Sequence, residues 1–152
     1  MVDVFSIHKN DFDEYQTLTK DFIKKTSRYS QIQDIVVFNK DIVKSQKISE
    51  MEAKKSYSKA YQKHLSGYCV GLDVKGLSID SLEFSKILEH PKVSFFIAGA
   101  YGFENSFLSK CNKVISLSHM TFSHKIAKIV LFEQIFRGFC ILNNHPYHKG
   151  SF

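Results

Sequence analysis

The sequence lacks tryptophan and contains only two prolines, seven glycines and three cysteines among its 152 residues. So few prolines and glycines leave little room for flexible linkers. Cys69, Cys111 and Cys140 are odd in number and have no paired spacing, so we expect reduced, buried thiols and no disulfide framework. No apolar run approaches the ~18 residues of a membrane span, and Asp3 and His8 come too early for a signal peptide. We therefore expect a cytoplasmic protein that does not enter a membrane.

Apolar and aromatic residues, in contrast, are plentiful. Hydrophobic residues make up 43% of the chain and aromatic residues 14%, with fourteen phenylalanines. This composition excludes a disordered chain and favours a densely packed globule. A chain of this size can bury about two-thirds of its unfolded surface. We therefore expect residues 1–152 to form one domain.

Basic residues outnumber acidic ones by 21 to 15, which favours an anionic partner. The excess is concentrated between residues 40 and 64, where seven lysines and three acidic residues give four of the six net positive charges. Two interpretations of this basic segment stay open, a solvated helix face and a surface that contacts RNA. The lysines are Lys40, Lys44, Lys47, Lys54, Lys55, Lys59 and Lys63.

Short β-branched runs alternate along the chain with segments of helical spacing. We expect strands at residues 2–7, 32–38, 68–74, 93–97 and 114–117. We expect helices at 11–23, 53–65, 81–89, 105–111 and 126–139, a polar, basic loop at 39–48 and a sharp turn at 75–76. This alternation predicts an α/β fold, with a mostly parallel sheet covered by helices on both faces.

The expected helix ends carry recognisable capping residues. Asp11 with Glu14 resembles a capping box at the start of the first helix, and Asp80 and Ser123 are suitable N-caps further along. The last helix is apolar on more than one side. We therefore expect it to be buried on two sides, and we expect the protein to form a dimer because one small domain could not cover both.

Residues 98–102 read Ala-Gly-Ala-Tyr-Gly and lie between an expected strand and an expected helix. A glycine turn in this place allows a phosphate or a nucleoside to approach the backbone closely. The spacing lacks the G-x-G-x-x-G pattern of dinucleotide-binding folds. An ordinary strand-to-helix turn remains the alternative.

Residues 117–122 and 143–149 are the other two segments with chemical potential. The first is a non-helical loop that could present backbone groups to an adenine edge, although Met120 and Phe122 alone would be interpreted as core residues. In the second, Pro146 ends the preceding helix, and a terminal His-Pro-Tyr-His is ordinarily a frayed end. Arg137 follows Glu133 by one helical turn and either pairs with it or contacts a substrate.

Four of the seven histidines lie near the end of the chain, at His119, His124, His145 and His148. They suggest a metal site, but the sequence contains no HExxH motif and no cysteine at ligand spacing. We therefore expect no metal.

The strand and glycine turn of residues 95–102, the strand and loop of 114–124, and the terminal 143–149 occur in a characteristic order. Together they resemble the bacterial SPOUT-class methyltransferases that methylate N3 of a pseudouridine in 23S ribosomal RNA. The resemblance is close in the C-terminal half and covers the N-terminal half only in its order of elements. It implies a SPOUT-type α/β knot, in which a C-terminal trefoil knot forms the cofactor pocket and the dimer interface. Periodicity alone would give a doubly wound fold.

The resemblance also implies the site residues. The tail would reach the active site of the partner subunit and contact the RNA, with His145 or His148 assisting proton loss and Tyr147 orienting the base. Relatives usually have Gly in place of Ala98 and Pro in place of Ser123. The implied cofactor-binding residues, for S-adenosyl-L-methionine, are Leu72, Gly99, Leu117, Ser118, His119, Met120, Thr121 and Phe122, and the implied catalytic residues are Arg137, His145, Tyr147 and His148.

We therefore expect a homodimeric, S-adenosyl-L-methionine-dependent enzyme that methylates N3 of a pseudouridine in 23S rRNA, with the assembled ribosome as its substrate. One alternative is a SPOUT methyltransferase that acts on another RNA, such as transfer RNA. The other is a non-catalytic, basic RNA-binding protein with the same fold. A valine at Gly99 is expected to fill the space of the nucleoside and leave the fold largely intact.

Overall fold

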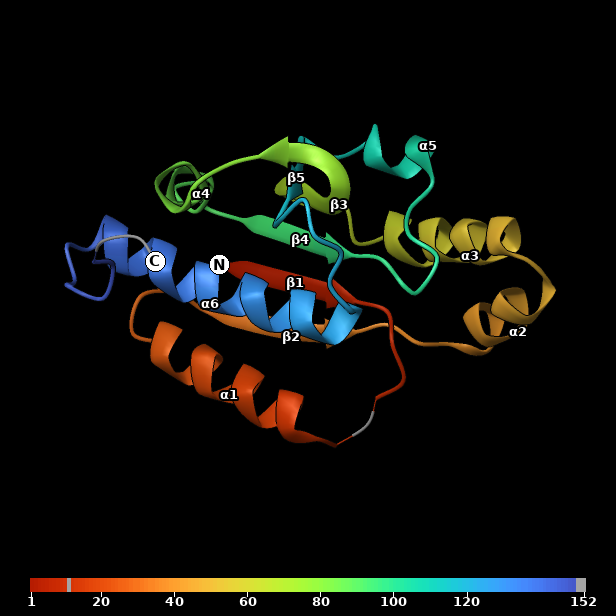
Figure 1. Ribbon diagram of the computed structural model, residues 1–152, viewed down its shortest axis with the longest axis horizontal. Coiled ribbons are helices and arrows are strands. Elements are labelled where there is room, and N and C mark those ends of the chain that lie inside the picture. The colour runs from red at the N-terminus through yellow and green to blue at the C-terminus, as the bar shows by residue number, and fades with distance from the viewer. Residues whose placement is uncertain (11, 150–152) are drawn as a thin grey trace.

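A five-stranded parallel sheet forms the centre of the computed structural model, which describes residues 1–10 and 12–149 (Figure 1). The strand order is β2-β1-β4-β3-β5. The strands are β1 (Val2–Ser6), β2 (Ile32–Val36), β3 (Tyr68–Ser78), β4 (Val93–Ile97) and β5 (Lys113–Ser116). The helices are α1 (Glu14–Thr26), α2 (Lys40–Ile48), α3 (Glu50–Gln62), α4 (Ser81–Ile87), α5 (Asn105–Leu108) and α6 (His124–Leu142).

Helices cover both faces of the sheet, because its strands are apolar on both sides. Val4 and Phe95 join a core with α1, α4 and α6, whereas the neighbouring Phe5 and Phe96 join a second core with α2, α3 and α5. Side chains alternate between the two faces of a strand, so each central strand contributes to both cores. The predicted α/β fold, with a parallel sheet between two helical layers, is confirmed.

Helix α6 is buried on two sides, as predicted, but within one chain. It lies against the sheet between α1 and α4 (Figure 1), and Leu131 and Ile135 are fully buried. The Phe136 ring lies 6.4 Å from that of Phe22 on α1, and Gly138 packs closely against Leu88 just after α4. The apolarity of α6 is therefore explained inside the subunit and does not by itself require a second copy.

The expected basic loop at residues 39–48 is wrong, because these residues form helix α2. Asn39 caps it by accepting a hydrogen bond from the Ile42 backbone N–H at 2.8 Å. Ile42 is fully buried against the α3 side of the sheet. One buried isoleucine and a good cap are enough to hold a helix whose other positions are mostly polar.

The expected turn at residues 75–76 is also wrong, since β3 continues to Ser78. The pairing of β3 with β5 shifts register between Leu72 and Leu77, which marks a bulge. A Cβ atom on Gly76 would lie 2.6 Å from the Ile115 carbonyl carbon. This glycine therefore permits two backbones to approach closely within a bent strand.

Helix α1 begins later than its pattern indicated. Asp13 is its N-cap and accepts from the Gln16 N–H at 3.1 Å, and Phe12 precedes the helix with its side chain exposed. The expected cap at Asp11 lies outside the described residues. The predicted caps of α4 by Asp80 and of α6 by Ser123 are confirmed, and Glu83 completes a capping box with Asp80.

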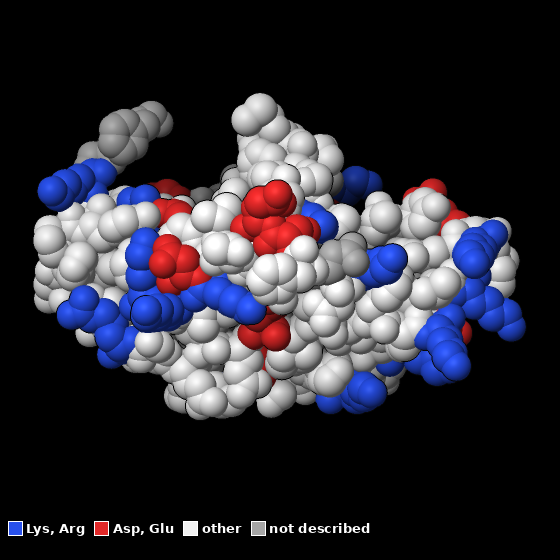
Figure 2. Space-filling view, turned by 90° about the horizontal axis from the view of Figure 1, so that it is seen from below, with Lys and Arg blue, Asp and Glu red and all other residues white. Residues whose placement is uncertain are grey.

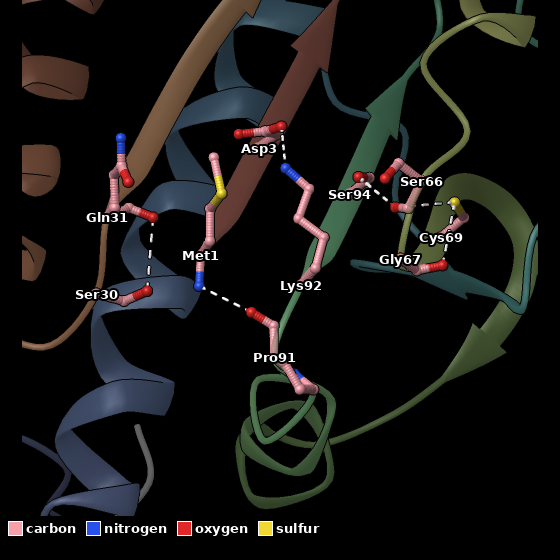
Figure 3. Close-up of polar contacts among 10 residues, drawn as sticks. All are labelled: Met1, Asp3, Ser30, Gln31, Ser66, Gly67, Cys69, Pro91, Lys92 and Ser94. Carbon is pink, nitrogen blue, oxygen red and sulfur yellow. Dashed lines mark hydrogen bonds and ion pairs between the residues drawn. The ribbon is translucent and has the colours of Figure 1, made fainter.

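Polar contacts close the amino-terminal end of the sheet (Figure 3). The Met1 ammonium donates to the Pro91 carbonyl at 3.1 Å, and Lys92 forms an ion pair with Asp3 across β4 and β1. Ser94 donates to the Ser66 carbonyl at 2.8 Å, which ties β4 to the segment before β3. Because these contacts occupy the amino-terminal end of the sheet, space for a ligand remains at its carboxyl end.

After β5 the chain runs past the ends of β4 and β1 before it enters α6 (Figure 1). This path crosses from one edge of the sheet to the helical layer over β1. The trefoil knot, which only the resemblance implied, stays a prediction.

Cys69 and Cys140 are buried free thiols, as expected, and Cys111 is a half-buried one. Burial raises the pKa of the Cys111 thiol to about 11. In the described part of the chain, no helix has the length and apolarity to cross a membrane. Nor does any cluster of three or more His, Cys, Asp or Glu side chains there have an arrangement suited to a metal ion.

Candidate functional site

A cavity of about 390 Å³ opens at the carboxyl ends of β3, β4 and β5. Its wall is formed by residues 72–74 of β3, the glycine turn after β4, the loop between β5 and α6, and the first turn of α6. In parallel α/β sheets, ligands bind outside the carboxyl ends of the strands, and a cavity of this size holds a nucleoside-sized molecule. The sequence-predicted residues in the wall are Leu72, Gly99, Leu117, Ser118, Met120 and Phe122.

The glycine turn brings its backbone to the cavity. The Gly102 N–H donates to the Gly99 carbonyl at 3.1 Å, and Gly102 has a φ of +81° with open space where a side chain would be. Ala98 packs toward the core of α2, α3 and α5 and also lines the cavity. This alanine, where the resemblance to the family leads us to expect glycine, therefore forms part of the cavity wall.

Gly99 lines the cavity, and Tyr57 occupies the space that a side chain at this position would need. A Cβ atom at Gly99 would lie 2.4 Å from the Tyr57 ring and 2.5 Å from its hydroxyl oxygen. The Tyr57 hydroxyl in turn donates to Gln46 Oε1 at 2.5 Å, and burial raises the pKa of this phenol. The expectation that a valine at Gly99 leaves the fold intact is therefore wrong, because the larger side chain would displace Tyr57.

Gly99→Ala should lower the free energy of unfolding by about 1–3 kcal/mol, the usual cost of overpacking a core. Chemical denaturation measures this difference. The Tyr57→Leu background is the control, because a smaller side chain there relieves the collision and should reduce the cost of the alanine. An equal cost in both backgrounds would contradict the role assigned to Tyr57.

The 117–122 loop alternates between the cavity and the solvent. Leu117, Met120 and Phe122 line the cavity, whereas His119 and Thr121 are exposed and lie outside its wall. Met120 is 71% exposed, so its interpretation as a core residue is wrong. An apolar side chain held open at the rim of a cavity is available to contact a ligand or a partner.

Serines set the shape of this loop. Ser116 donates to the Ser118 carbonyl at 2.8 Å, and Ser118 Oγ accepts from the Met120 N–H at 3.0 Å. Ser123 then accepts from the Ile126 N–H at 3.4 Å and begins α6. Ser123 is thus the N-cap of α6, at the position where the resemblance leads us to expect proline.

Sequence reasoning missed part of the cavity wall. Ile97, Ser116, His124 and Ala127 also line it. Their place in the chain could have indicated them, since Ile97 and Ser116 end two strands and His124 and Ala127 lie in the first turn of the helix that follows. His124 also stacks on His8, with ring centroids 5.6 Å apart, and burial lowers the pKa of both imidazoles.

The predicted catalytic residues form a second group on the carboxyl-terminal half of α6. Arg137 donates to Glu133 Oε1 from Nε at 3.0 Å and from Nη2 at 2.7 Å. Tyr147 donates to the same Glu133 oxygen at 3.0 Å, and Arg137 Nη1 lies 3.1 Å from His148 Nδ1. His145 closes the helix end, where its N–H donates to the Cys140 carbonyl at 2.8 Å. The described part of the tail therefore folds back onto its own helix.

The electrostatics of this group limit what each member can do. Burial, together with the hydrogen bond to Glu133, raises the pKa of Tyr147, so its phenol is a donor and not a base. The hydrogen bonds to Glu133 raise the pKa of Arg137, which keeps the guanidinium charged beside the tail. Arg137 also lies over the Tyr147 ring, 4.7 Å from its centroid.

The two groups lie apart within one chain. Ala127 is in the cavity wall, whereas Arg137 lies ten residues further along α6, about 15 Å at the rise of an α-helix. The tail is attached at the far end of the same helix (Figure 1). The structure thus brings most of the predicted cofactor residues together and groups the predicted catalytic residues, but it does not join the two sets.

Comparisons with known proteins give a consistent result. The family described as "Predicted SPOUT methyltransferase" matches residues 1–148. A protein of Aliarcobacter butzleri is 46% identical over 149 residues, which cover 97% of this chain and 99% of that protein. One from Campylobacter fetus subsp. fetus is 51% identical over 147 residues, covering 96% and 97%. Both relatives carry the name ribosomal RNA large subunit methyltransferase H.

Two solved structures share the fold at low sequence identity. A probable methylase family protein from Haemophilus influenzae is 12% identical with a TM-score of 0.54, and the match covers 96% of this chain and 67% of that one. A putative RNA methyltransferase from Bacillus anthracis is 11% identical with a TM-score of 0.54, over the whole of both chains.

Proposed function

This chain belongs to the SPOUT methyltransferase family, and we propose that it transfers a methyl group from S-adenosyl-L-methionine to N3 of a pseudouridine in 23S ribosomal RNA. Relatives near half identity over almost their whole length are ribosomal RNA methyltransferases, and this chain is one as well. The observation that carries the finer proposal is the cavity, which contains six of the eight residues predicted for the cofactor.

The cavity fits S-adenosyl-L-methionine in size and chemistry. Its apolar wall, with Leu72, Ile97 and Phe122, suits the faces of an adenine ring, and the backbone groups of residues 98–102 and 117–118 suit its polar edges. When bound, the sulfonium supplies an already activated methyl group. The protein then has to align the acceptor nitrogen with that methyl group and exclude water.

The tail residues are proposed to act on the acceptor base. The imide N–H at N3 is a weak acid, and His145 or His148 can assist its loss as a general base. Tyr147 orients the base through a hydrogen bond, since its phenol holds its proton. Arg137 carries a fixed positive charge beside the tail, which suits an RNA phosphate.

We propose a homodimer, because the cavity and the tail lie at opposite ends of α6 in one chain. A second copy can bring its tail to the open rim of the cavity. That rim is apolar and uncovered, with Val74 53% exposed and Met120 71% exposed. Burying such an apolar surface against a partner subunit would stabilise the dimer. We further propose the assembled ribosome as the substrate, in the cytoplasm.

The test is transfer of a labelled methyl group from S-adenosyl-L-methionine to ribosomal RNA, both free and in assembled ribosomes. Nucleoside mass spectrometry should then identify 3-methylpseudouridine in the large-subunit RNA. Methylation of transfer RNA alone would select the alternative substrate. Cofactor binding without any transfer would favour a non-catalytic RNA-binding protein and contradict the proposal.

A further inference from the structure

The outward face of α2 is basic and exposed. Lys40, Lys44 and Lys47 recur at helical spacing, are exposed, and line an open groove together with Phe38, Asn39 and Val43. None of these three lysines forms an ion pair or a side-chain hydrogen bond with any residue that the structure describes. Figure 2 shows Lys and Arg side chains gathered at the end of the molecule where α2 lies.

The lysines of α3 differ. Lys54 lies 3.4 Å from Glu50 and Lys55 lies 3.5 Å from Glu52, so each has an acidic partner on its own helix. The basic segment that the sequence presents as continuous therefore divides into a part on α3, in which two lysines form ion pairs with glutamates, and a part on α2, in which the three lysines form none with the described residues. Asp41 is the one acidic residue of α2.

Phe38 gives this face an aromatic member. It lies two residues after the end of β2, is 38% exposed, and lines the groove together with Lys40. An exposed phenylalanine is costly in water, and next to lysines it matches the surfaces that bind unpaired nucleotides. There, an aromatic ring stacks on a base and the cations contact the phosphates.

The other side of α2 is firmly attached near the cavity. Ile42 is fully buried, and Gln46 accepts a hydrogen bond from Tyr57, whose ring packs under Gly99 in the cavity wall. The α2 face is therefore held in a fixed position relative to the proposed cofactor site. Both lie at the carboxyl end of the sheet.

We propose that the outward face of α2, with Phe38, Lys40, Lys44 and Lys47, binds a single-stranded segment of the substrate RNA away from the methylated base. Phe38 stacks on a base, and the lysines contact successive phosphates. The choice of RNA as the occupant rests on the proposed function and on three exposed lysines that form no ion pair with the described residues. A second copy of this chain, which carries the same charge, would be repelled from this face.

The first experiment replaces Lys40, Lys44 and Lys47 together with Gln and measures binding to a short, fluorescein-labelled single-stranded RNA at several salt concentrations. Loss of three phosphate contacts should weaken binding and make the plot of log affinity against log salt less steep by about 2, at ~0.7 per contact. The matched control replaces Lys54, Lys55 and Lys59 with Gln. It removes the same charge, but two of these lysines are already paired, so its slope should change much less.

The second experiment tests stacking. Phe38→Ala should weaken RNA binding about tenfold or more, the scale of one lost base–aromatic contact, and should leave the salt slope unchanged. Ile48→Ala is the control, because Ile48 is an exposed apolar residue of α2 outside the groove. Melting curves of all variants should match that of the parent protein, since none of the replaced side chains is buried.

Three outcomes would overturn the proposal: equal slopes for the two triple variants, no loss with Phe38→Ala, or a change of oligomeric state in the α2 variant. A change of oligomeric state would show that the α2 face forms a contact between two copies of the chain. Methyl transfer to ribosomes by the parent protein is measured in parallel. If the parent protein transfers no methyl group, the proposed function fails, whereas the binding data still decide the role of α2.

Discussion

A chain that ends after Asn144 should lose methyl transfer by a factor of at least ~100, the scale of positioned acid–base groups, and should keep its fold. The cost in stability should be small, about 1 kcal/mol, because the tail adds mainly a half-exposed Tyr147 against Phe136 and surface hydrogen bonds to Glu133. Methyl transfer at saturating RNA and a thermal melting curve measure the two effects separately.

Tyr147→Phe is the matched control for this truncation. It keeps the ring against Phe136, 4.7 Å away, and removes only the hydroxyl that donates to Glu133. If Tyr147 orients the target base, this variant should lose part of the activity with an unchanged melting temperature. Full activity in the truncated protein would show that the tail is only a frayed end.

Ala127→Phe should abolish binding of S-adenosyl-L-methionine, with affinity lower by two orders of magnitude or more, which is about 3 kcal/mol. Ala127 lies on the first turns of α6 with its side chain in the cavity wall, so a phenyl ring there occupies the space that the cofactor needs. Calorimetric titration with S-adenosyl-L-methionine measures the loss. Gly99 is unsuitable for this purpose, because its substitution disturbs Tyr57 first.

Ile126→Phe is the control for the cavity variant, since Ile126 is the neighbouring residue, is 39% exposed and lies outside the cavity wall. It should bind the cofactor as the parent protein does. Undiminished affinity in a folded Ala127→Phe protein would place the cofactor elsewhere.

The two variants can be combined to test whether the tail acts across the dimer. A heterodimer of the truncated chain and the Ala127→Phe chain joins one intact cavity to one intact tail from the other subunit. Activity should reappear when the subunits exchange. An inactive heterodimer, verified by mass, would show that the tail does not act in the partner's site.

The sequence predicted the layers of this fold because strand and helix periodicities are strong where residues are buried. It failed where tertiary contacts outweigh local preference. Helix α2 depends on one buried apolar residue, Ile42, and on a cap by Asn39, and neither stands out in a segment rich in lysine. Gly76 is a residue typical of turns, but here it allows the backbones of β3 and β5 to approach closely. Periodicity describes one segment at a time and cannot detect what lies opposite it.

The candidate site was predictable to a similar degree. The loops were found because glycine and polar residues follow apolar strands, and most of their predicted members line one cavity. The role of Gly99 could not be anticipated, since the Tyr57 ring that excludes its side chain is far away in the sequence. Nor could the sequence show that the tail packs at the opposite end of α6 from the cavity.

The central place of β1 bears on how the polypeptide matures during its synthesis. β1 is made first, yet it lies between two strands, with Val2 beside Ile32 on one side and beside Val93 on the other. Its second ladder must wait until β4 has left the ribosomal tunnel, and until then an apolar strand edge is open to wrong pairing. Such distant partners also slow the search for the native topology. We therefore infer that the nascent N-terminal half depends on prompt completion of the chain, or on chaperone protection, to avoid aggregation.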